Sequence, residues 1–482
     1  MENSRRITFE ILLEYFVKKR NLNDIIDRYL KIRKPKPQDK SLIYQISKGV
    51  VKRYITLDFL ISRISGLKIE KIEILSLLAL RIALFQIIFL DRIPDYSSVS
   101  ESVSIIKGFR GRKSANFVNA VLRKATRIPD IYQFLEENIK KVRDRNRQES
   151  IRHSFPEWLV RYWGRTYSSD ILKKILESLN RNPEFYFRIN TLKITEKDFY
   201  DDASSFFSGP YETFLDGTAF KIKDKFEEFI NSKFIREGLL FVQNLSSQIA
   251  IRYFLNPGPG EKVLDICSAP GGKSVSSALM MKNEGEIIAI ESNEKRLKIL
   301  EGNVKRMGAD IIRSINADAG KEYFLQTDKR GNNYKKQKDQ SNDYNEYFDK
   351  IFIDLPCSSF GTVSKNPDTK YNKDIGRLKI FKENSLKILH NAAPYLKRGG
   401  KITLYTCTLS KIENEELINE FMDKNEGRYK VDNTDSIRRL VNENVRDFPE
   451  INCLPESGNI IEILPWYLNS EGASICSLIK LK

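Results

Sequence analysis

The chain has 482 residues, of which 41% are hydrophobic and 30% charged, so it can form two or three domains with buried cores and does not have a membrane-like composition. Lysine and arginine exceed aspartate and glutamate by 81 to 64, and the net charge of +17 favours a polyanionic partner, most simply a nucleic acid, with a well-solvated surface as the alternative. The five cysteines form no Cys-x-x-Cys pair, which argues against a disulfide framework and a zinc site, and reduced thiols fit a cytoplasmic protein.

Residues 1–128 predict an all-helical domain. Apolar residues recur with helical spacing in four segments, at residues 7–19, 41–64, 71–90 and 114–127. The most apolar run, residues 74–90, contains Arg81 and Gln86, so we expect a buried helix there and no membrane span. The charged, helix-like N-terminus does not have the pattern of a signal peptide.

Basic residues gather near the end of this domain, at Lys107, Arg110, Arg112, Lys113, Arg123, Lys124 and Arg127. Lysines and arginines on one helix face can follow an RNA backbone, and an ordinary exposed helix is the alternative interpretation. The segments RIPDYSSVSESVSIIK and NFVNAVLRK resemble the last helices of the NusB-like RNA-binding domains. This resemblance implies that residues 1–128 bind RNA.

Residues 129–237 predict a linker helix and a small α/β subdomain. A charged helical pattern at residues 130–147 precedes a helix that begins near Pro156, a residue favoured in the first turn of a helix. Residues 185–193 have the pattern of a strand with Arg188 and Asn190 as its polar positions. Turn signals and short strand patterns follow, and they lead into the next domain.

Residues 238–482 predict a core in which strands and helices alternate. We expect strands at residues 263–267, 285–292, 311–316, 350–354 and 401–408, with helices at residues 273–282, 293–307 and 378–395. The alternation predicts an α/β fold with a doubly wound, mostly parallel, Rossmann-like sheet. Strand-like pieces at residues 460–466 and 473–481 would form an antiparallel end hairpin, and the Lys-, Asn- and Asp-rich residues 325–347 predict a mobile surface insertion.

A glycine loop joins the first strand of this core to its first helix. The strand ends at Cys267, and Pro270, Gly271 and Gly272 form a turn in which a ligand can approach the backbone and the helix N-terminus. The loop is not a Walker A sequence, so a nucleoside triphosphate is not indicated. Glu291 follows about 20 residues later at the end of the next strand, where Rossmann-like folds place the acid that binds a ribose diol.

Two cysteines lie where strands run out into loops. Cys407 ends the strand at residues 401–408, and Cys357 follows the strand that ends at Asp354. Because parallel sheets bind ligands beyond the carboxyl ends of their strands, both thiols are well placed for chemistry, and a buried core cysteine is the alternative. The chain has only two histidines, His153 and His390, which argues against a histidine-based triad or metal centre.

The segments LDICSAPGGKS, DLPCS and YTCT together resemble the Nol/Nop/Sun family of RNA cytosine-5 methyltransferases. The resemblance implies a class I methyltransferase core in which the thiolate of Cys407 adds to carbon 6 of a cytosine, so that carbon 5 can accept a methyl group. It also implies that Cys357 helps to release the product and that Asp354 hydrogen-bonds the cytosine edge. With its NusB-like front end, the chain resembles those members of the family that methylate small-subunit (16S) rRNA.

The same resemblance implies S-adenosylmethionine as the cofactor and no metal. The residues that it assigns to cofactor binding are Cys267, Ser268, Ala269, Pro270, Gly271, Gly272, Lys273, Glu291, Asp318 and Asp354. Glu291 would hold the ribose hydroxyls, although the family more often has an aspartate there, and Asp318 would lie near the adenine. Arg188 and Asn190 match a family segment near the cofactor or the RNA.

Three alternatives stay open on the sequence. The same chemistry could act on a transfer RNA or another rRNA site, or the chain could be a non-catalytic RNA-binding assembly factor built on a methyltransferase scaffold. A DNA cytosine-5 methyltransferase would use Cys357 as its nucleophile, and the Thr-Cys context of Cys407 argues against that class. Nothing in the sequence requires a membrane or a second subunit, so we expect a monomer.

Overall fold

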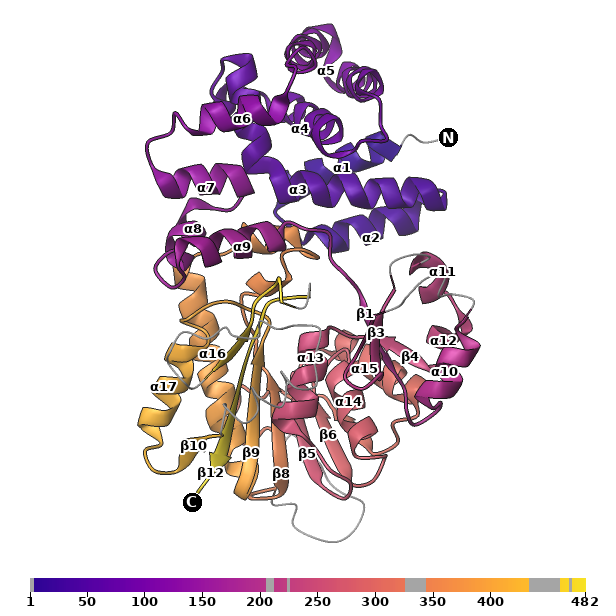
Figure 1. Ribbon diagram of the computed structural model, residues 1–482, viewed down its shortest axis with the longest axis vertical. Helices are drawn as coiled ribbons and strands as arrows, with labels where there is room; N and C mark the ends of the chain where they lie inside the picture. The colour runs from indigo at the N-terminus through magenta and orange to yellow at the C-terminus, as the bar shows by residue number, and fades with distance from the viewer. Residues whose placement is uncertain (1–3, 205–211, 223–225, 326–343, 433–459, 468–469) are drawn as a thin grey trace. The chain divides into compact units, whose positions relative to one another are not determined.

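The computed structural model describes the chain except for residues 1–3, 205–211, 223–225, 326–343, 433–459 and 468–469 (Figure 1). Its contacts divide the chain into two compact units, Met1–Arg181 with Val363–Asp374, and Asn182–Thr362 with Ile375–Lys482. The sequence-based boundaries at residues 128 and 237 stay a prediction. Within the described residues, no helix has an apolar stretch long enough to cross a membrane, and no three histidine, cysteine, aspartate or glutamate side chains gather to hold a metal ion.

The first unit is helical throughout its described length. Its α-helices are α1 (Ser4–Lys18), α2 (Leu22–Arg33), α3 (Pro37–Ser65), α4 (Ile74–Phe89), α5 (Asp95–Ala125), α6 (Ile131–Ile139), α7 (Arg145–His153), α8 (Glu157–Trp163) and α9 (Ser169–Leu179). Two 3₁₀-helices, η1 (Ile69–Lys71) and η5 (Pro367–Lys370), accompany them. Four of the α-helices, α1, α3, α4 and α5, overlap the four predicted segments, and the structure adds α2 among them.

Helix α4 is buried on nearly all sides, as its composition predicts. The two polar residues within it have partners inside the unit. The guanidinium of Arg81 donates two hydrogen bonds of 2.7 Å to the carboxylate of Asp58 and lies 4.5 Å from the ring centroid of Phe16. The side chain of Gln86 accepts a hydrogen bond of 2.8 Å from Arg5 Nε. These partners let a charged and a polar side chain occupy a helix that is otherwise apolar.

Helix α5 is longer than its apolar pattern predicts. The segment at residues 114–127 gives only its second half, because the helix begins at Asp95 and bends at Gly111, where φ is 77°. The seven basic residues that the sequence groups here are all exposed. Arg110 is 3.2 Å from Glu73 in an ion pair, so part of this charge is compensated within the unit.

A short segment from far along the sequence, Val363–Asp374, belongs to the first unit. Lys370 in this segment is fully buried, donates a hydrogen bond of 3.0 Å to the backbone carbonyl of Lys52, and lies 3.9 Å from the ring centroid of Phe155. The neighbouring Tyr371 donates a hydrogen bond of 2.8 Å to the carbonyl of Ser154. Burial, and then the nearby Arg53 and Lys52, hold the pKa of Lys370 well below its ordinary value. The segment is therefore part of the core of the first unit.

The second unit begins with a small antiparallel sheet in the order β2-β3-β1-β4. Its strands are β1 (Tyr186–Ile189), β2 (Glu212–Phe214), β3 (Ala219–Lys221) and β4 (Leu240–Val242), and its helices are α10 (Glu196–Asp202), α11 (Phe226–Ile230) and α12 (Lys233–Arg236). Phenylalanines fill its core, with the rings of Phe187, Phe199 and Phe220 in contact. This is the small α/β subdomain that the sequence predicts.

The large sheet of the second unit has the order β10-β12-β9-β8-β5-β6-β7, with β11 paired to β12. Its strands are β5 (Lys262–Ile266), β6 (Glu286–Ile290), β7 (Ile312–Ile315), β8 (Phe348–Asp354), β9 (Leu396–Thr406), β10 (Tyr429–Val431), β11 (Ile461–Ile463) and β12 (Ala473–Lys480). The strands β5 to β9 pair in parallel, and β12 pairs antiparallel with β9, β10 and β11. The α/β fold class, the parallel sheet and the antiparallel strands at its end are confirmed.

Helices cover both faces of this sheet. They are α13 (Leu245–Ile249) with the π-helix Ala250–Leu255, α14 (Gly272–Met280), α15 (Glu294–Met307), α16 (Ile375–Ala392) and α17 (Glu415–Lys424). Side chains of α16 and α17 pack in one apolar core with alternate residues of β5, β6, β8 and β9. Helix α15 packs against sheet residues that alternate with these and therefore point to the opposite face. Two 3₁₀ turns of this unit, Phe360–Thr362 and Ala393–Tyr395, lie within this stretch of the sequence.

The strand order changes direction at β5, which lies between β6 and β8. Sheets of this kind bind ligands beyond the carboxyl ends of the strands at such a switch point. Most of the predicted insertion at residues 325–347 lies outside the described residues, as does Cys453.

Gly49 tests the packing of α3 against α4. A methyl group at this position would come within 1.9 Å of a ring carbon of Phe85, so we expect Gly49→Ala to lower the free energy of unfolding by about 1–3 kcal/mol through overpacking. Urea unfolding followed by tryptophan fluorescence measures this, because Trp158 and Trp163 lie in the same unit. Gly108→Ala is the matched control, since its added methyl group meets open space, and an equal loss in both variants would contradict the close contact.

Candidate active site

The two predicted catalytic thiols lie at the ends of neighbouring parallel strands. Cys407 directly follows β9, and Cys357 lies three residues after Asp354, the last residue of β8. Their sulfur atoms are 3.5 Å apart, and both residues are partly exposed. The hydroxyl of Ser359 lies 3.3 Å from Cys407 Sγ and 3.9 Å from Cys357 Sγ. The fold therefore brings together two residues that are 50 positions apart in the sequence.

The surroundings of Cys357 favour its protonated form. Its contact with Cys407, its burial, and the nearby carboxylates of Glu413 and Asp354 raise the pKa of the Cys357 thiol well above its ordinary value. A thiol that keeps its proton next to a second sulfur can donate a hydrogen bond to that sulfur. The two sulfur atoms are close enough for such a contact.

Asp354 is held by a residue of the glycine loop. Lys273, in the first turn of α14, donates a hydrogen bond of 2.8 Å to Asp354 Oδ2, and its ammonium group lies 4.8 Å from the ring centroid of Tyr405. Burial alone would lower the pKa of Lys273, but the charge of Asp354, the hydrogen bond to it, and the nearby Tyr405 and Asp265 together outweigh this effect, and the net shift is upward. The ion pair connects the predicted cofactor loop directly to the predicted catalytic acid.

Asp265 is a candidate site residue that the sequence reasoning missed. It lies in β5, is 2% exposed, and accepts a hydrogen bond from Ser274 Oγ, while its Oδ1 atom has no hydrogen-bond partner among the described residues. Burial raises the pKa of Asp265 to about 7, against the opposing effects of Ser274 and Lys273. An acid inside a strand, two residues before the glycine loop begins, is the signal that could have identified it.

The predicted glycine loop is fixed in place by its neighbours. Both the backbone N–H and the hydroxyl of Ser268 donate to the carbonyl of Ile290 in β6. The carbonyl of Ala269 accepts from Arg296, and the carbonyl of Pro270 accepts from Asn303, both in α15. Gly271 caps the N-terminus of α14 with φ at 101°, a conformation that favours glycine. The carbonyl of Gly272 accepts from the side chains of Gln243 and Ser276.

A cavity of about 440 Å³ opens beside this loop and contains two of the predicted residues, Cys267 and Asp318. Ser292 and Gly320 also line it, together with residues of α16 that the sequence reasoning did not select, Phe381, Asn384, Lys387 and Ile388. Burial, and then the nearby carboxylates, raise the pKa of the Cys267 thiol to about 12, which favours its protonated form.

Glu291 has one carboxylate oxygen available for a ligand. Its Oε1 atom accepts a hydrogen bond of 2.8 Å from the backbone N–H of Asn293. Its Oε2 atom is buried, has no hydrogen-bond partner among the described residues, and lies 3.4 Å from Arg296 Nη1 in an ion pair. An unused acceptor at the end of β6, next to the cavity-lining Ile290 and Ser292, fits a diol that donates hydrogen bonds.

Arg188 lies in β1 and Asn190 directly follows this strand, and the two side chains have different environments. The side-chain amide of Asn190 donates to the carbonyls of Gly238 and Met307, at 2.7 and 2.8 Å, so it ties the small sheet to the end of α15. Arg188 is 4% exposed, and burial with the nearby Arg252 lowers its pKa to about 10. Two of its nitrogen atoms have no hydrogen-bond partner among the described residues.

Three family models match this chain. The model of the 16S rRNA methyltransferase RsmB/F matches residues 252–460, that of the NusB family matches residues 2–127, and that of the RsmF/B-like ferredoxin-like domain matches residues 155–202. A probable ribosomal RNA small subunit methyltransferase B from Bacillus subtilis (strain 168) is 29% identical over 487 residues, which cover 99% of this chain and 98% of the relative.

Two solved structures have the same fold. The crystal structure of PH0851 aligns with a TM-score of 0.71 at 22% identity and covers 99% of this chain and 98% of that one. NSun6 from Pyrococcus horikoshii, solved with SFG, aligns with a TM-score of 0.54 at 20% identity and covers 68% of this chain and 99% of that one.

The raised pKa of Asp265 predicts a specific pH dependence of stability. An unfolded aspartate titrates near pH 4, so the cost of ionising the buried carboxyl is absent below about pH 4, grows as the pH rises, and is complete above about pH 7. Asp265→Asn removes this cost. We expect the difference in unfolding free energy, variant minus wild type, to increase between pH 4 and pH 7 and then level off in urea titrations. The exposed Asp310→Asn serves as the control, and parallel curves for all three proteins would contradict the prediction.

Proposed function

Since this chain belongs to the RsmB/Sun family of S-adenosylmethionine-dependent methyltransferases, we propose that it transfers a methyl group to carbon 5 of a cytosine in small-subunit rRNA. The observation that carries this proposal is the pair of thiols, Cys407 and Cys357, whose sulfur atoms are 3.5 Å apart beside Asp354. The name of the Bacillus subtilis relative supports small-subunit rRNA as the substrate.

Carbon 5 of cytosine is too weak a nucleophile to take a methyl group directly. In the proposed reaction the thiolate of Cys407 forms a bond to carbon 6, and the electron pair of the ring double bond moves to carbon 5. Carbon 5 would then form its bond to the methyl group, while the bond from that methyl group to the sulfonium sulfur of its donor would break and leave its electron pair on the sulfur. A base removes the proton from carbon 5, the bond between carbon 6 and Cys407 Sγ breaks, and the thiolate is restored.

Cys357 and Asp354 have distinct parts in this proposal. Cys357 keeps its proton and lies within hydrogen-bonding range of Cys407 Sγ, so it stabilises the thiolate that leaves carbon 6. Asp354, held by Lys273, accepts a hydrogen bond from the cytosine edge and thereby favours the protonated ring, whose added proton offsets the negative charge that develops on it. A cytosine within a helix would first have to leave its base stack.

The cofactor is proposed to be S-adenosylmethionine, which supplies the methyl group from its sulfonium. Glu291 would accept hydrogen bonds from the ribose through its unused Oε2 atom, and Asp318 would face the adenine end in the cavity beside Cys267. The loop from Ser268 to Lys273 would follow the rest of the molecule. The NSun6 neighbour was solved with SFG, an analogue of this cofactor, which supports the assignment.

The remaining assignments follow from the substrate. The NusB-like part of the chain, with its exposed basic residues on α5, would bind the rRNA. A protein that modifies ribosomal RNA in bacteria would act in the cytoplasm. We propose that this chain acts there as a monomer. The same chemistry on another RNA is the second candidate. A non-catalytic assembly factor is a third, and the presence of both thiols and the Lys273–Asp354 ion pair speaks against it.

Methyl transfer from labelled cofactor to unmodified small-subunit rRNA tests the division of work between the thiols. We expect wild-type activity, none in Cys407→Ala because no bond to carbon 6 can form, and a stable RNA–protein adduct in Cys357→Ala because attack proceeds while release fails. Denaturing gel electrophoresis detects the adduct. An active Cys407→Ala variant would overturn the assignment of the nucleophile, and cofactor binding without any RNA labelling by the wild type would favour the assembly factor.

Charge reversal on α5 tests the RNA-binding assignment. We expect the double variant Arg123→Glu with Lys124→Glu to weaken rRNA binding and to reduce the slope of log K against log salt by about 1 for each lost phosphate contact. Filter binding at several salt concentrations measures both quantities. The pair Lys31→Glu and Lys34→Glu on and after α2 carries the same charge change at exposed positions, and equal losses in the two double variants would point to net charge alone.

A further inference from the structure

A buried carboxylate joins the two cysteine-bearing loops. Glu413 lies six residues after Cys407, between β9 and α17, and is 2% exposed. Its Oε1 atom accepts a hydrogen bond of 2.6 Å from the backbone N–H of Ser358, and its Oε2 atom accepts one of 2.7 Å from the hydroxyl of the same residue. Ser358 directly follows Cys357, so a side chain from one loop holds the backbone of the other.

The Ser358 hydroxyl extends this connection back to the first loop. Its oxygen lies 2.6 Å from the hydroxyl oxygen of Thr408, the residue that directly follows Cys407. The residue after each thiol therefore belongs to one fully buried network with Glu413. Both hydrogen bonds to Glu413 are short, at 2.6 and 2.7 Å. Short distances are typical of hydrogen bonds to an ionised carboxylate, which are stronger than those between neutral groups.

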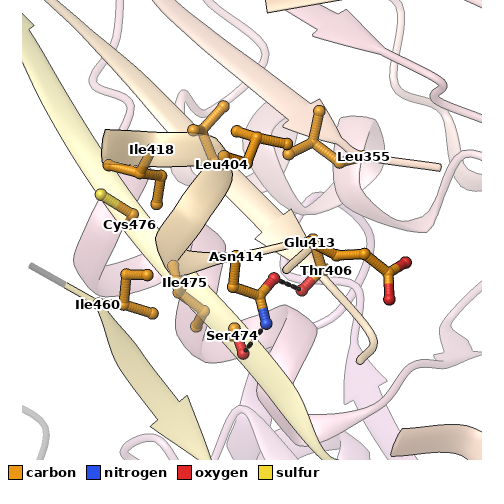
Figure 2. A pocket seen from close by; sticks show the side chains of 11 residues that line it. Leu355, Leu404, Thr406, Glu413, Asn414, Ile418, Ile460, Ser474, Ile475 and Cys476 are labelled. Carbon is orange, nitrogen blue, oxygen red and sulfur yellow. Dashed lines mark hydrogen bonds between the residues drawn. The ribbon is translucent and has the colours of Figure 1, made fainter. Parts of the chain in front are cut away.

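The neighbouring Asn414 fixes the position from which Glu413 reaches the loop. Its side-chain oxygen accepts a hydrogen bond of 2.7 Å from Thr406, and its nitrogen donates to the carbonyl of Thr408 and to the hydroxyl of Ser474 in β12. Figure 2 shows this amide between Thr406 and Ser474, with the carboxylate of Glu413 pointing away from it. The cavity that these residues line is about 10 Å³, the size of one water molecule, so it leaves little room for the loop to shift.

We propose that Glu413 is a positioning residue that holds the thiols of Cys357 and Cys407 at the separation that their joint work requires, acting through Ser358 and Thr408. Glu413 does not touch the reacting atoms in this arrangement. Its part in product release rests on the proposed function, whereas its part in holding the two sulfur atoms together does not. The nearby Glu413 carboxylate also contributes to the raised pKa of Cys357.

The first test measures thiol proximity and needs no RNA. Diamide takes two hydrogen atoms from a pair of nearby thiols and leaves a disulfide, and the Cys357–Cys407 disulfide can be followed over time by peptide mass spectrometry. In the full chain we expect Glu413→Gln to form this disulfide about tenfold more slowly than wild type, since it loses charge-assisted hydrogen bonds. Loss of the charge would by itself ease ionisation of Cys357 and speed the reaction, so a slower rate reports geometry.

Matched variants separate this effect from general disturbance. Glu416→Gln, at an exposed position of α17, should react at the wild-type rate. Thr408→Val removes the hydroxyl that faces Ser358 and should slow the reaction, whereas Thr403→Val, which removes a buried hydroxyl 2.9 Å from Ser477 Oγ, should leave the rate unchanged. Equal disulfide rates in wild type, Glu413→Gln and Thr408→Val would overturn the proposal.

The second test uses methyl transfer to small-subunit rRNA. We expect Glu413→Gln to lose about tenfold in kcat, to keep the wild-type KM for S-adenosylmethionine, and to accumulate the covalent RNA–protein adduct as Cys357→Ala does. Activity that falls only with the folded fraction in circular dichroism, without any adduct, would overturn a role in release. If the wild type labels no RNA, the proposed function fails, and the disulfide rates still decide whether Glu413 positions the thiols.

Discussion

The parallel pairing of β8 with β9 is the interaction on which the site depends. Asp354 is in register with Tyr405, so both strands end at the same edge of the sheet and their cysteine-bearing loops begin side by side. Two backbone hydrogen bonds continue this pairing past the strands, from Leu355 to the carbonyl of Tyr405 and from Gly361 to the carbonyl of Cys407, both 2.9 Å. Gly361 must be a glycine, because an added methyl group would lie 1.9 Å from the carbonyl oxygen of Gly472.

The carboxylates at this edge of the sheet differ in the groups that donate hydrogen bonds to them. Asp354 has the ammonium group of Lys273, Glu413 has the N–H and hydroxyl of Ser358, and Asp265 has a single hydroxyl donor and an unused oxygen. The only donor to Asp265 among the described residues is a neutral hydroxyl, and burial raises the pKa of this acid to about 7. The loop or helix that faces each acid supplies its hydrogen-bond donors. The strand order decides which loop or helix that is.

The sequence predicted those features that local patterns encode. Alternation of apolar and polar residues, together with turn signals, predicted where the strands end. Cys357, Cys407, Asp354 and the glycine loop could therefore be located at strand ends. The structure brings these residues to one edge of the sheet. The partners of Glu413 and Asp354 could not be predicted, because Ser358 is 55 residues from Glu413 and Lys273 is 81 residues from Asp354. The expected position of Asn190 near the cofactor or the RNA stays a prediction, and the sequence did not indicate that its amide donates to two backbone carbonyls.

The segment Val363–Asp374 has a consequence for the order in which the chain folds during synthesis. The first unit is otherwise complete at Arg181, yet its core includes the buried Lys370 and the ring of Tyr371. On a ribosome that adds about 5–20 residues per second, these side chains emerge roughly 10–40 seconds after Arg181. Until then the carbonyls of Lys52 and Ser154 lack these side-chain donors. The N-terminal unit therefore reaches its final state only after residues 182–362 of the second unit have been synthesised.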